Sequence, residues 1–129
     1  MKPTRKELDD LWSKAVKLRD GNKSVWSGKT ERLNAHHVLK KGTFRLRWEL
    51  DNGITITCGE HKFIAHGGGK RADEFKKWAL KRFSAKRRKE LEQMNYQIGG
   101  TDLWAVKLYL IQKIAEFSKS KNCIEGCKL

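Results

Sequence analysis

Apolar residues recur at the spacing of an amphipathic helix near the start of the chain, at Leu8, Leu11, Trp12, Ala15 and Val16. The preceding Thr4-Arg5-Lys6-Glu7 has the form of a capping box, in which Thr4 caps the first turn and Glu7 reaches back to its start. Asp20-Gly21 closes the segment. The pattern predicts an N-terminal helical segment at 5–20, with the helix itself at about 5–19.

The pattern changes over residues 22–57, where short runs are separated by glycines and by the turn sequence Asn52-Gly53. Two of these runs, Arg45–Leu50 and Ile54–Thr57, alternate in polarity or carry β-branched residues. We therefore expect two or three short strands joined by a long loop.

Helical spacing returns after this region. His61–His66 has room for one or two turns before the Gly67-Gly68-Gly69 run. Ser84 can cap one later helix and Thr101 a last one, with a turn at 96–100 between them. The expected apolar positions of these helices are Phe75, Trp78, Ala79, Phe83, Leu91 and Met94, then Leu103, Trp104, Leu110, Ile111, Ile114 and Phe117. The element order predicts an α+β fold.

Length and composition fit one small domain. The chain has 129 residues, of which 38% are hydrophobic, enough for a modest core. Its apolar stretches fall far short of the roughly 20 residues needed to cross a bilayer, and its start does not resemble a secretory signal. Cys58, Cys123 and Cys127 do not suggest a disulfide framework. We therefore expect no membrane association and place the chain in a reducing compartment, the cytoplasm.

The chain is strongly basic, because 29 Lys and Arg against 15 Asp and Glu give a net charge of +14. Such an excess favours a polyanionic partner, since each neutralised phosphate releases counterions. We expect this partner to be nucleic acid. The alternative is that the positive charge serves only solubility or unspecific adhesion. Charge by itself gives no indication of catalysis.

The four histidines, His36, His37, His61 and His66, fall within about thirty residues, and Asn52 lies between them. Neutral imidazole binds metals and titrates near neutrality, so it can also act as a base. Adjacent strand residues point to opposite faces, which allows His36 and His37 to take different roles. Alternatively, these are ordinary strand residues and Asn52-Gly53 is only a turn. The ordered set of His-His, Asn and His favours a functional site.

Three segments in this order resemble the HNH nuclease motif with its ββα-metal fold: Leu33-Asn34-Ala35-His36-His37-Val38, Trp48-Glu49-Leu50-Asp51-Asn52-Gly53-Ile54-Thr55, and His61. More narrowly, the chain resembles phage-encoded HNH endonucleases, some of which are described as recombination nucleases. The similarity covers most of 8–117 and is specific over 33–61. Together with the helical pattern, it implies a single domain made of an N-terminal helix (5–20), an HNH ββα-metal core (22–69) and C-terminal helices (70–117). Residues 118–129 are polar, and we expect them to form a frayed tail.

The chain departs from this family at the structural zinc site, which usually has two Cys-x-x-Cys pairs. The matching positions keep the spacing but hold other residues: Ser24, Ser27, Thr57 and Glu60. Cys58 is one residue out of register, and hydroxyl groups are poor zinc ligands at neutral pH. We therefore expect no structural zinc, with Trp26 and Trp48 supplying packing instead.

The resemblance also implies a role for each matching site residue. His36 and His61 would bind one catalytic divalent metal, and His37 would be the general base that deprotonates the attacking water. Asn52 would either order the loop that carries the base or join the metal shell. His66 lies about 140° around an ideal helix from His61, so it is either a third ligand or a group facing phosphate or solvent.

The identity of the metal depends on this ligand set. Three-histidine coordination would favour a transition metal such as Mn²⁺, Ni²⁺ or Zn²⁺. A set of His36, His61 and Asn52 would also accept Mg²⁺.

Basic residues flank the histidine pair and begin a second block after it, at Lys40, Lys41, Arg45, Arg47, Lys70 and Arg71. Such side chains can hold DNA phosphates, which supplies affinity but no sequence information. The alternative is a solvated helix face; the excess of one sign favours phosphate contact. Phe75, Trp78 and Phe83 are expected in the core, and we do not interpret the Cys123–Cys127 spacing as a metal site.

Together these features predict a metal-dependent endonuclease that hydrolyses the phosphodiester backbone of DNA. Two alternatives remain: a non-catalytic nucleic-acid-binding module on the same scaffold, and an accessory factor whose nuclease acts only in a complex. Because one centre cuts one strand, duplex cleavage would require a homodimer or two encounters.

Overall fold

The computed structural model describes residues 2–39, 44–94 and 101–127, with side chains described for 46–94 and 101–119 of the last two ranges. Lys40, Lys41 and the turn expected at 96–100 lie outside the described residues. The side chains of Arg45, Cys123 and Cys127 also lie outside the description.

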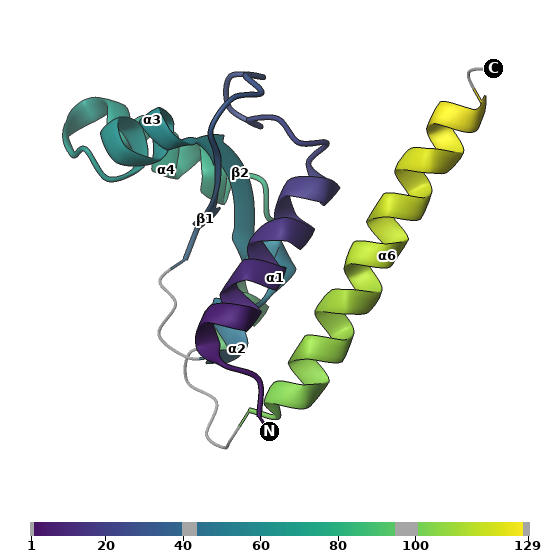
Figure 1. Cartoon of the computed structure of the whole chain (residues 1–129). Coiled ribbons are helices and arrows are strands. Elements are labelled where there is room, and N and C mark those ends of the chain that lie inside the picture. Colours follow the sequence, from purple (N-terminus) through teal and green to yellow (C-terminus); the bar gives the residue numbers. More distant parts are fainter. Residues whose placement is uncertain (1, 40–43, 95–100, 128–129) are drawn as a thin grey trace.

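The described chain is an α+β fold in which a two-stranded antiparallel sheet is covered by helices (Figure 1). Its elements are α1 (Arg5–Arg19), β1 (Leu33–His37), α2 (Phe44–Arg47), a 3-10 turn (Leu50–Asn52), β2 (Gly53–Thr57), α3 (Cys58–Glu60), a π-helical turn (His61–Ala65), α4 (Gly69–Leu80), α5 (Ala85–Met94) and α6 (Leu103–Cys127). Helix α1 lies between α6 and the sheet, in contact with both. Within the described part of the chain, no helix is both long enough and apolar enough to span a membrane.

The first helix has the predicted bounds, and its cap is half of the predicted capping box. The side chain of Thr4 accepts a hydrogen bond from the backbone N–H of Glu7 at 3.1 Å. The Glu7 carboxylate instead lies 2.6 Å from Nζ of Lys107 on α6. The expected reach of Glu7 back to the start of the helix is therefore replaced by an ion pair that joins α1 to α6.

Strand β2 is buried on both faces, which explains its run of β-branched residues. It pairs with β1 so that His36 lies opposite Ile54 and His37 opposite Gly53. A Cβ atom added at Gly53 would lie 2.5 Å from Cζ2 of Trp12, so α1 packs directly on the strand backbone. On the other face, Ile54 packs in a cluster with Phe75 of α4.

The prediction of a strand at Arg45–Leu50 is wrong, because this stretch covers most of α2 and the first residue of the 3-10 turn. Leu46, Trp48 and Leu50 are buried, whereas Arg47 and Glu49 are partly exposed. Burial therefore does alternate along this stretch, but the alternation arises from a helical turn followed by extended residues, not from a strand. A period of two does not distinguish that combination from a strand over so few residues.

The last helix differs from its prediction in cap, length and face. Asp102, not Thr101, accepts the N–H bonds of Trp104 and Ala105, at 3.0 and 3.2 Å. The helix continues through the expected frayed tail as far as Cys127. Trp104 and Ile111, expected in the core, are 47% and 45% exposed. Both lie about 100° around the helix from the buried face.

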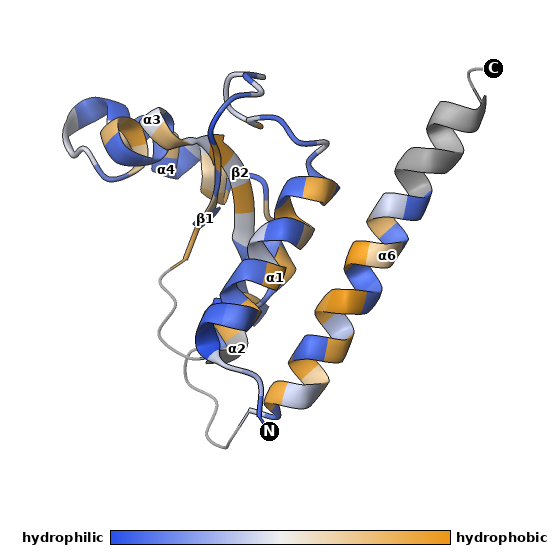
Figure 2. Cartoon of the chain, viewed as in Figure 1, coloured by the Kyte–Doolittle hydropathy of each residue, from blue (hydrophilic) through white to orange (hydrophobic). Residues whose placement is uncertain are grey.

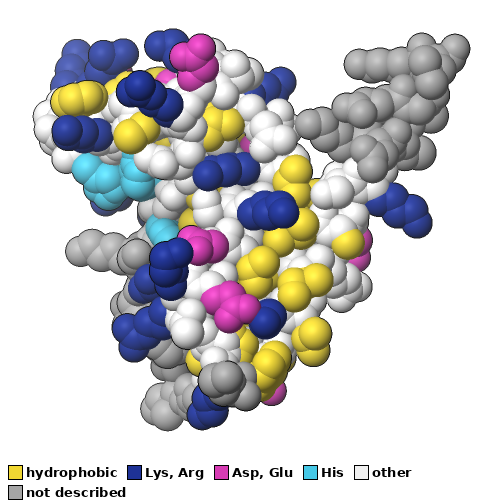
Figure 3. Space-filling view, viewed as in Figure 1, with side chains coloured by type: hydrophobic (Ala, Val, Ile, Leu, Met, Phe, Trp, Pro, Cys, Tyr) yellow, Lys and Arg dark blue, Asp and Glu magenta, His cyan; other side chains and the backbone are white. Residues whose placement is uncertain are grey.

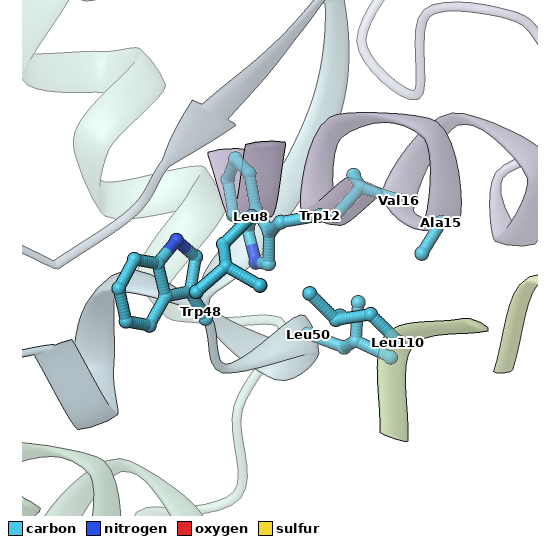
Figure 4. Packing of buried hydrophobic residues seen from close by; sticks show 7 residues of the cluster. All are labelled: Leu8, Trp12, Ala15, Val16, Trp48, Leu50 and Leu110. Carbon is cyan, nitrogen blue, oxygen red and sulfur yellow. The ribbon is translucent and has the colours of Figure 1, made fainter. Parts of the chain in front are cut away.

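The main apolar core lies where α1 meets α6 and the segment before β2. Figure 4 shows Trp48 and Leu50 beside the α1 side chains, with Leu110 approaching from α6. Its buried members are Leu8, Trp12, Ala15, Val16, Trp48, Leu50 and Leu110. Figure 2 shows hydrophobic and hydrophilic residues alternating along α6, as expected for a helix with one buried face.

Candidate metal centre and nucleic-acid interface

Three of the four histidines converge, although they come from different elements. His36 lies on β1, His61 begins the π-helical turn and His66 follows it. The ring centroids of His36 lie 5.0 Å from His61 and 5.3 Å from His66, and those of His61 and His66 are 4.7 Å apart. One nitrogen from each ring lies within 4.8 Å of the others. The predicted metal-binding histidines therefore form one group, and His66 belongs to it.

The π-helical turn is what brings His66 to His61. The backbone N–H of His66 donates to the carbonyl of His61 at 3.2 Å, an i to i+5 bond. Such a bond spreads one turn over more residues than an α-helix does, so positions five apart return to the same side. The two Nε2 atoms lie 3.1 Å apart. The predicted separation of 140° assumed an α-helix and does not apply here.

Burial keeps the inner histidines neutral. Burial, followed by the neighbouring rings of His61, His66 and His37, lowers the pKa of His36 to about 3. Burial and the adjacent His66 also lower the pKa of His61. Imidazole binds a metal only through the lone pair of its neutral form. His36 and His61 therefore have the protonation state that a metal ligand needs at neutral pH.

The donor types suit a divalent transition metal. Ligand nitrogens about 2.0–2.1 Å from one ion lie roughly 2.9–3.4 Å apart at ordinary coordination angles. The 3.1 Å between the Nε2 atoms of His61 and His66 falls in this range, whereas the ligand atoms of all three histidines lie within 4.8 Å of one another. Nδ1 of His36 is buried without a hydrogen-bond partner among the described residues, an arrangement that costs free energy. Ring nitrogens of His36, His61 and His66 could serve as ligands to one such divalent cation.

His37 points away from this group, and its contacts include a stacked ring and a hydrogen bond. Its ring stacks on Trp12, with centroids 4.0 Å apart and planes within 6°. Its Nε2 lies 2.8 Å from the backbone carbonyl of Arg47, which can only accept, so Nε2 carries the proton. The lone pair of the neutral ring is then on Nδ1. The opposite orientation of adjacent strand residues is therefore confirmed for His36 and His37.

All four histidines nevertheless line one open cleft of about 1140 Å³, together with residues of α1 and α4. Figure 3 shows histidine side chains at the molecular surface, with Lys and Arg side chains near them. The three-histidine group and His37 therefore border the same cleft.

Asn52 is fully buried and orders the loop after β1. Its Oδ1 accepts from the N–H of Leu39 at 2.7 Å, and its Nδ2 donates to the carbonyls of Leu39 and Leu46 at 3.1 and 3.3 Å. The amide therefore ties the end of β1 to α2, whose Arg47 carbonyl holds His37. Of the two roles left open for Asn52, this geometry supports loop ordering.

The four positions that match structural zinc ligands also meet, in a hydrogen-bonded cluster around the Glu60 carboxylate. Oε1 of Glu60 accepts from Oγ of Ser24 at 2.6 Å and from the N–H of Thr57 at 2.8 Å. Ser24 also accepts from the N–H of Ser27 at 3.1 Å. Burial alone would raise the pKa of Glu60, but the hydrogen bonds from Ser24, Ser27 and Thr57 lower it.

Sequence reasoning treated these positions only as lost ligands and missed the cluster. Thr57 and Glu60 form a complete capping box at the start of α3, and the Thr-x-x-Glu spacing could have revealed it. Because Glu60 directly precedes His61, the cluster fixes the start of the segment that carries two of the three histidines.

The predicted phosphate-binding residues are not equivalent. Lys70 and Arg71 are exposed at the start of α4. The guanidinium of Arg47 instead donates to both carboxylate oxygens of Asp9, at 2.8 and 2.6 Å. That bidentate ion pair joins α2 to α1, so Arg47 has a structural engagement that its sequence position did not indicate.

Comparison of the chain with protein-family models, with curated proteins and with solved structures gave no match.

Proposed function

We propose that this protein is a metal-dependent endonuclease of the HNH, ββα-metal type that hydrolyses DNA. The observation that carries the proposal is that three histidine nitrogens converge while a fourth imidazole, set on a backbone carbonyl, lines the same cleft. The order of β1, β2 and α3 with its π-helical extension supports a ββα arrangement around that group.

His36, His61 and His66 would hold one divalent cation, with Mn²⁺, Ni²⁺ or Zn²⁺ favoured by the all-nitrogen donor set and Mg²⁺ less suited to it. When bound, the ion supplies Lewis-acid stabilisation of charge on the scissile phosphate and the departing oxygen. Asn52 then acts on the reaction only through the loop that it orders.

His37 would take the proton of the attacking water on Nδ1. The water oxygen forms the new bond to phosphorus while the bond from phosphorus to the 3′ oxygen breaks. The imidazolium produced is favoured by the Arg47 carbonyl at Nε2–H and by the indole face of Trp12. The chain thus separates metal binding from proton transfer by placing them on adjacent strand residues.

Plasmid relaxation with each of the four divalent ions tests this proposal. Wild type is expected to nick with at least one ion and to be inactive in EDTA. His37→Ala and His37→Phe, of which the second keeps a flat ring against Trp12, should lose about 10²–10⁴-fold in rate. Asn34→Ala, on the same strand but outside the cleft lining, serves as the control. Equal cleavage by wild type and both His37 variants would remove His37 from the mechanism.

A non-catalytic nucleic-acid-binding module is the second candidate, favoured by the exposed cations Lys70 and Arg71 beside the site. It predicts salt-dependent DNA binding and no nicking with any ion. Comparing binding and nicking in one set of buffers separates the two functions. Size-exclusion chromatography, with and without duplex DNA, tests whether a homodimer forms.

A further inference from the structure

Phe63 is 70% exposed, more than any other large hydrophobic side chain that the structure describes as exposed. Isolated exposed apolar residues are ordinary on protein surfaces and need no explanation by themselves. The location of Phe63 distinguishes it, because it lies on the π-helical turn between His61 and His66. An apolar ring is thus presented to solvent from the turn that connects two rings of the histidine group.

The backbone under this ring is fixed from both sides. Ile64, the next residue, is 8% exposed and packs in the cluster that contains Phe75. A Cβ atom added at Gly67 would collide with the backbone carbonyl of Phe63, so the turn closes tightly there. Ordering this ring on binding would cost little, since its backbone is already held in place.

One lysine lies beside the Phe63 ring, and exposed cations begin the helix that contacts the same turn. Nζ of Lys62 lies 5.4 Å from the centre of the Phe63 ring. Lys70 and Arg71 are exposed on α4, which contacts the π-helical turn. Lysine is depleted from the cores of protein–protein interfaces, whereas cations beside an exposed aromatic ring are typical of surfaces that bind single-stranded nucleic acid.

We propose that Phe63 stacks on an unpaired base of a DNA strand whose backbone is held by Lys62, Lys70 and Arg71. The inference deepens the proposed function, on which it rests for the location of the scissile phosphate. It specifies the substrate class as single-stranded DNA, or duplex opened beside the histidine group. A fully paired duplex offers this ring no free base face away from its ends.

The test is equilibrium binding of fluorescent oligonucleotides in EDTA, where cleavage is blocked. Wild type is compared with Phe63→Ala and Phe63→Trp on a single strand and on a long, fully paired duplex without a hairpin loop. Stacking of one base on an aromatic ring corresponds to a change of about 5- to 150-fold in affinity. We expect Phe63→Ala to lose binding to the single strand within that range, Phe63→Trp to retain it, and duplex binding to change less than twofold.

Leu108→Ala is the matched control, because Leu108 is also strongly exposed, at 65%, but lies on α6. It should bind both oligonucleotides like wild type. Unchanged single-strand binding by Phe63→Ala, an equal loss on both DNA forms, or no DNA binding by wild type would each overturn the inference. Since no step requires cleavage, a protein that binds as expected but never nicks would refute the proposed nuclease activity and leave Phe63 as a stacking residue.

Discussion

The two ends of the molecule are stabilised by different means. Where α1 meets α6, the buried side chains are apolar and include Leu8 and Leu110, both fully buried. At the histidine end, polar groups are buried beside the apolar cluster of Phe75, including His36 at 9% exposure and Glu60 at 7%. One end is held by packing, and the other also depends on directed hydrogen bonds.

The difference shows what a site of converging imidazoles requires. Apolar packing is non-directional, so it stabilises many similar arrangements of side chains. Ring nitrogens that meet at one point need fixed backbone directions, which hydrogen bonds such as those of Glu60 and Asn52 supply. The histidine end therefore places polar groups in its interior, where removing one partner leaves the other unsatisfied.

The largest stability effect is expected in the apolar core. Leu8→Ala should lower the free energy of unfolding by about 2–5 kcal/mol, because it removes a fully buried side chain and leaves a cavity. Urea denaturation measures the change. Leu108→Ala, at an exposed site on α6, is the matched control and should shift stability by less than about 0.5 kcal/mol. Equal effects would contradict the placement of α6 against α1.

Metal binding should stabilise the histidine end specifically. If His36, His61 and His66 bind Ni²⁺ or Zn²⁺, free ion at 100 times its dissociation constant should raise the free energy of unfolding by about 2.7 kcal/mol. Thermal melts with and without the ion measure this, and His61→Ala should abolish the increase. An increase that persists in His61→Ala would place the ion elsewhere.

Glu60→Gln should destabilise the chain by about 1–3 kcal/mol, because a buried carboxylate that accepts several hydrogen bonds becomes an amide with one acceptor oxygen. Ser24→Ala should have a smaller effect in the same direction. Both variants should also weaken metal binding, measured by calorimetry, because Glu60 precedes His61. Glu31→Gln, at an exposed position, is the control. A loss of stability with unchanged metal affinity would show that the cluster does not position His61.

The ion pair between Glu7 and Lys107 should give the smallest effect. The hydrogen bond from Lys107 to the Glu7 carboxylate is the main reason that the pKa of Glu7 lies below its ordinary value of 4.5. A lowered pKa means that the pair stabilises the fold above that pH, and that the contribution is lost as the pH falls through the folded-state value. Denaturation of wild type and Glu7→Gln over a descending pH series from pH 7 should show a small difference at pH 7 that shrinks as the pH falls. A difference that stays constant over the series would point to packing instead.

Local sequence patterns predicted correctly those elements whose tertiary packing favours the same secondary structure. The first helix and the β-branched strand at β2 have strong periodicity or composition, and the structure confirms both. Arg45–Leu50 failed because a helical turn followed by extended residues buries alternate positions, as a strand would, and local sequence does not separate the two. The cap at Asp102 failed because Thr101 and Asp102 are both good capping residues one position apart.

The candidate site was predictable in its members and less so in its geometry. The order of His-His, Asn and His identified the residues that line or order the cleft, whereas the HNH resemblance stays a prediction. The position of His66 beside His61 depends on the π-helical turn, and the spacing of apolar residues in the sequence does not predict such a turn. The Arg47–Asp9 pair and the stack of His37 on Trp12 join segments about 25–40 residues apart, and single-sequence patterns carry no signal for such contacts.

Trp12 belongs to both ends of the molecule. Its indole lies in the core beneath α6, donates from Nε1 to the carbonyl of Glu49 at 3.0 Å, and supports the ring of His37. Heating that loosens α1 would therefore displace that imidazole at the same time. Any chemistry that depends on His37 would share its upper temperature limit with the helical core, and thermal adaptation of one would constrain the other.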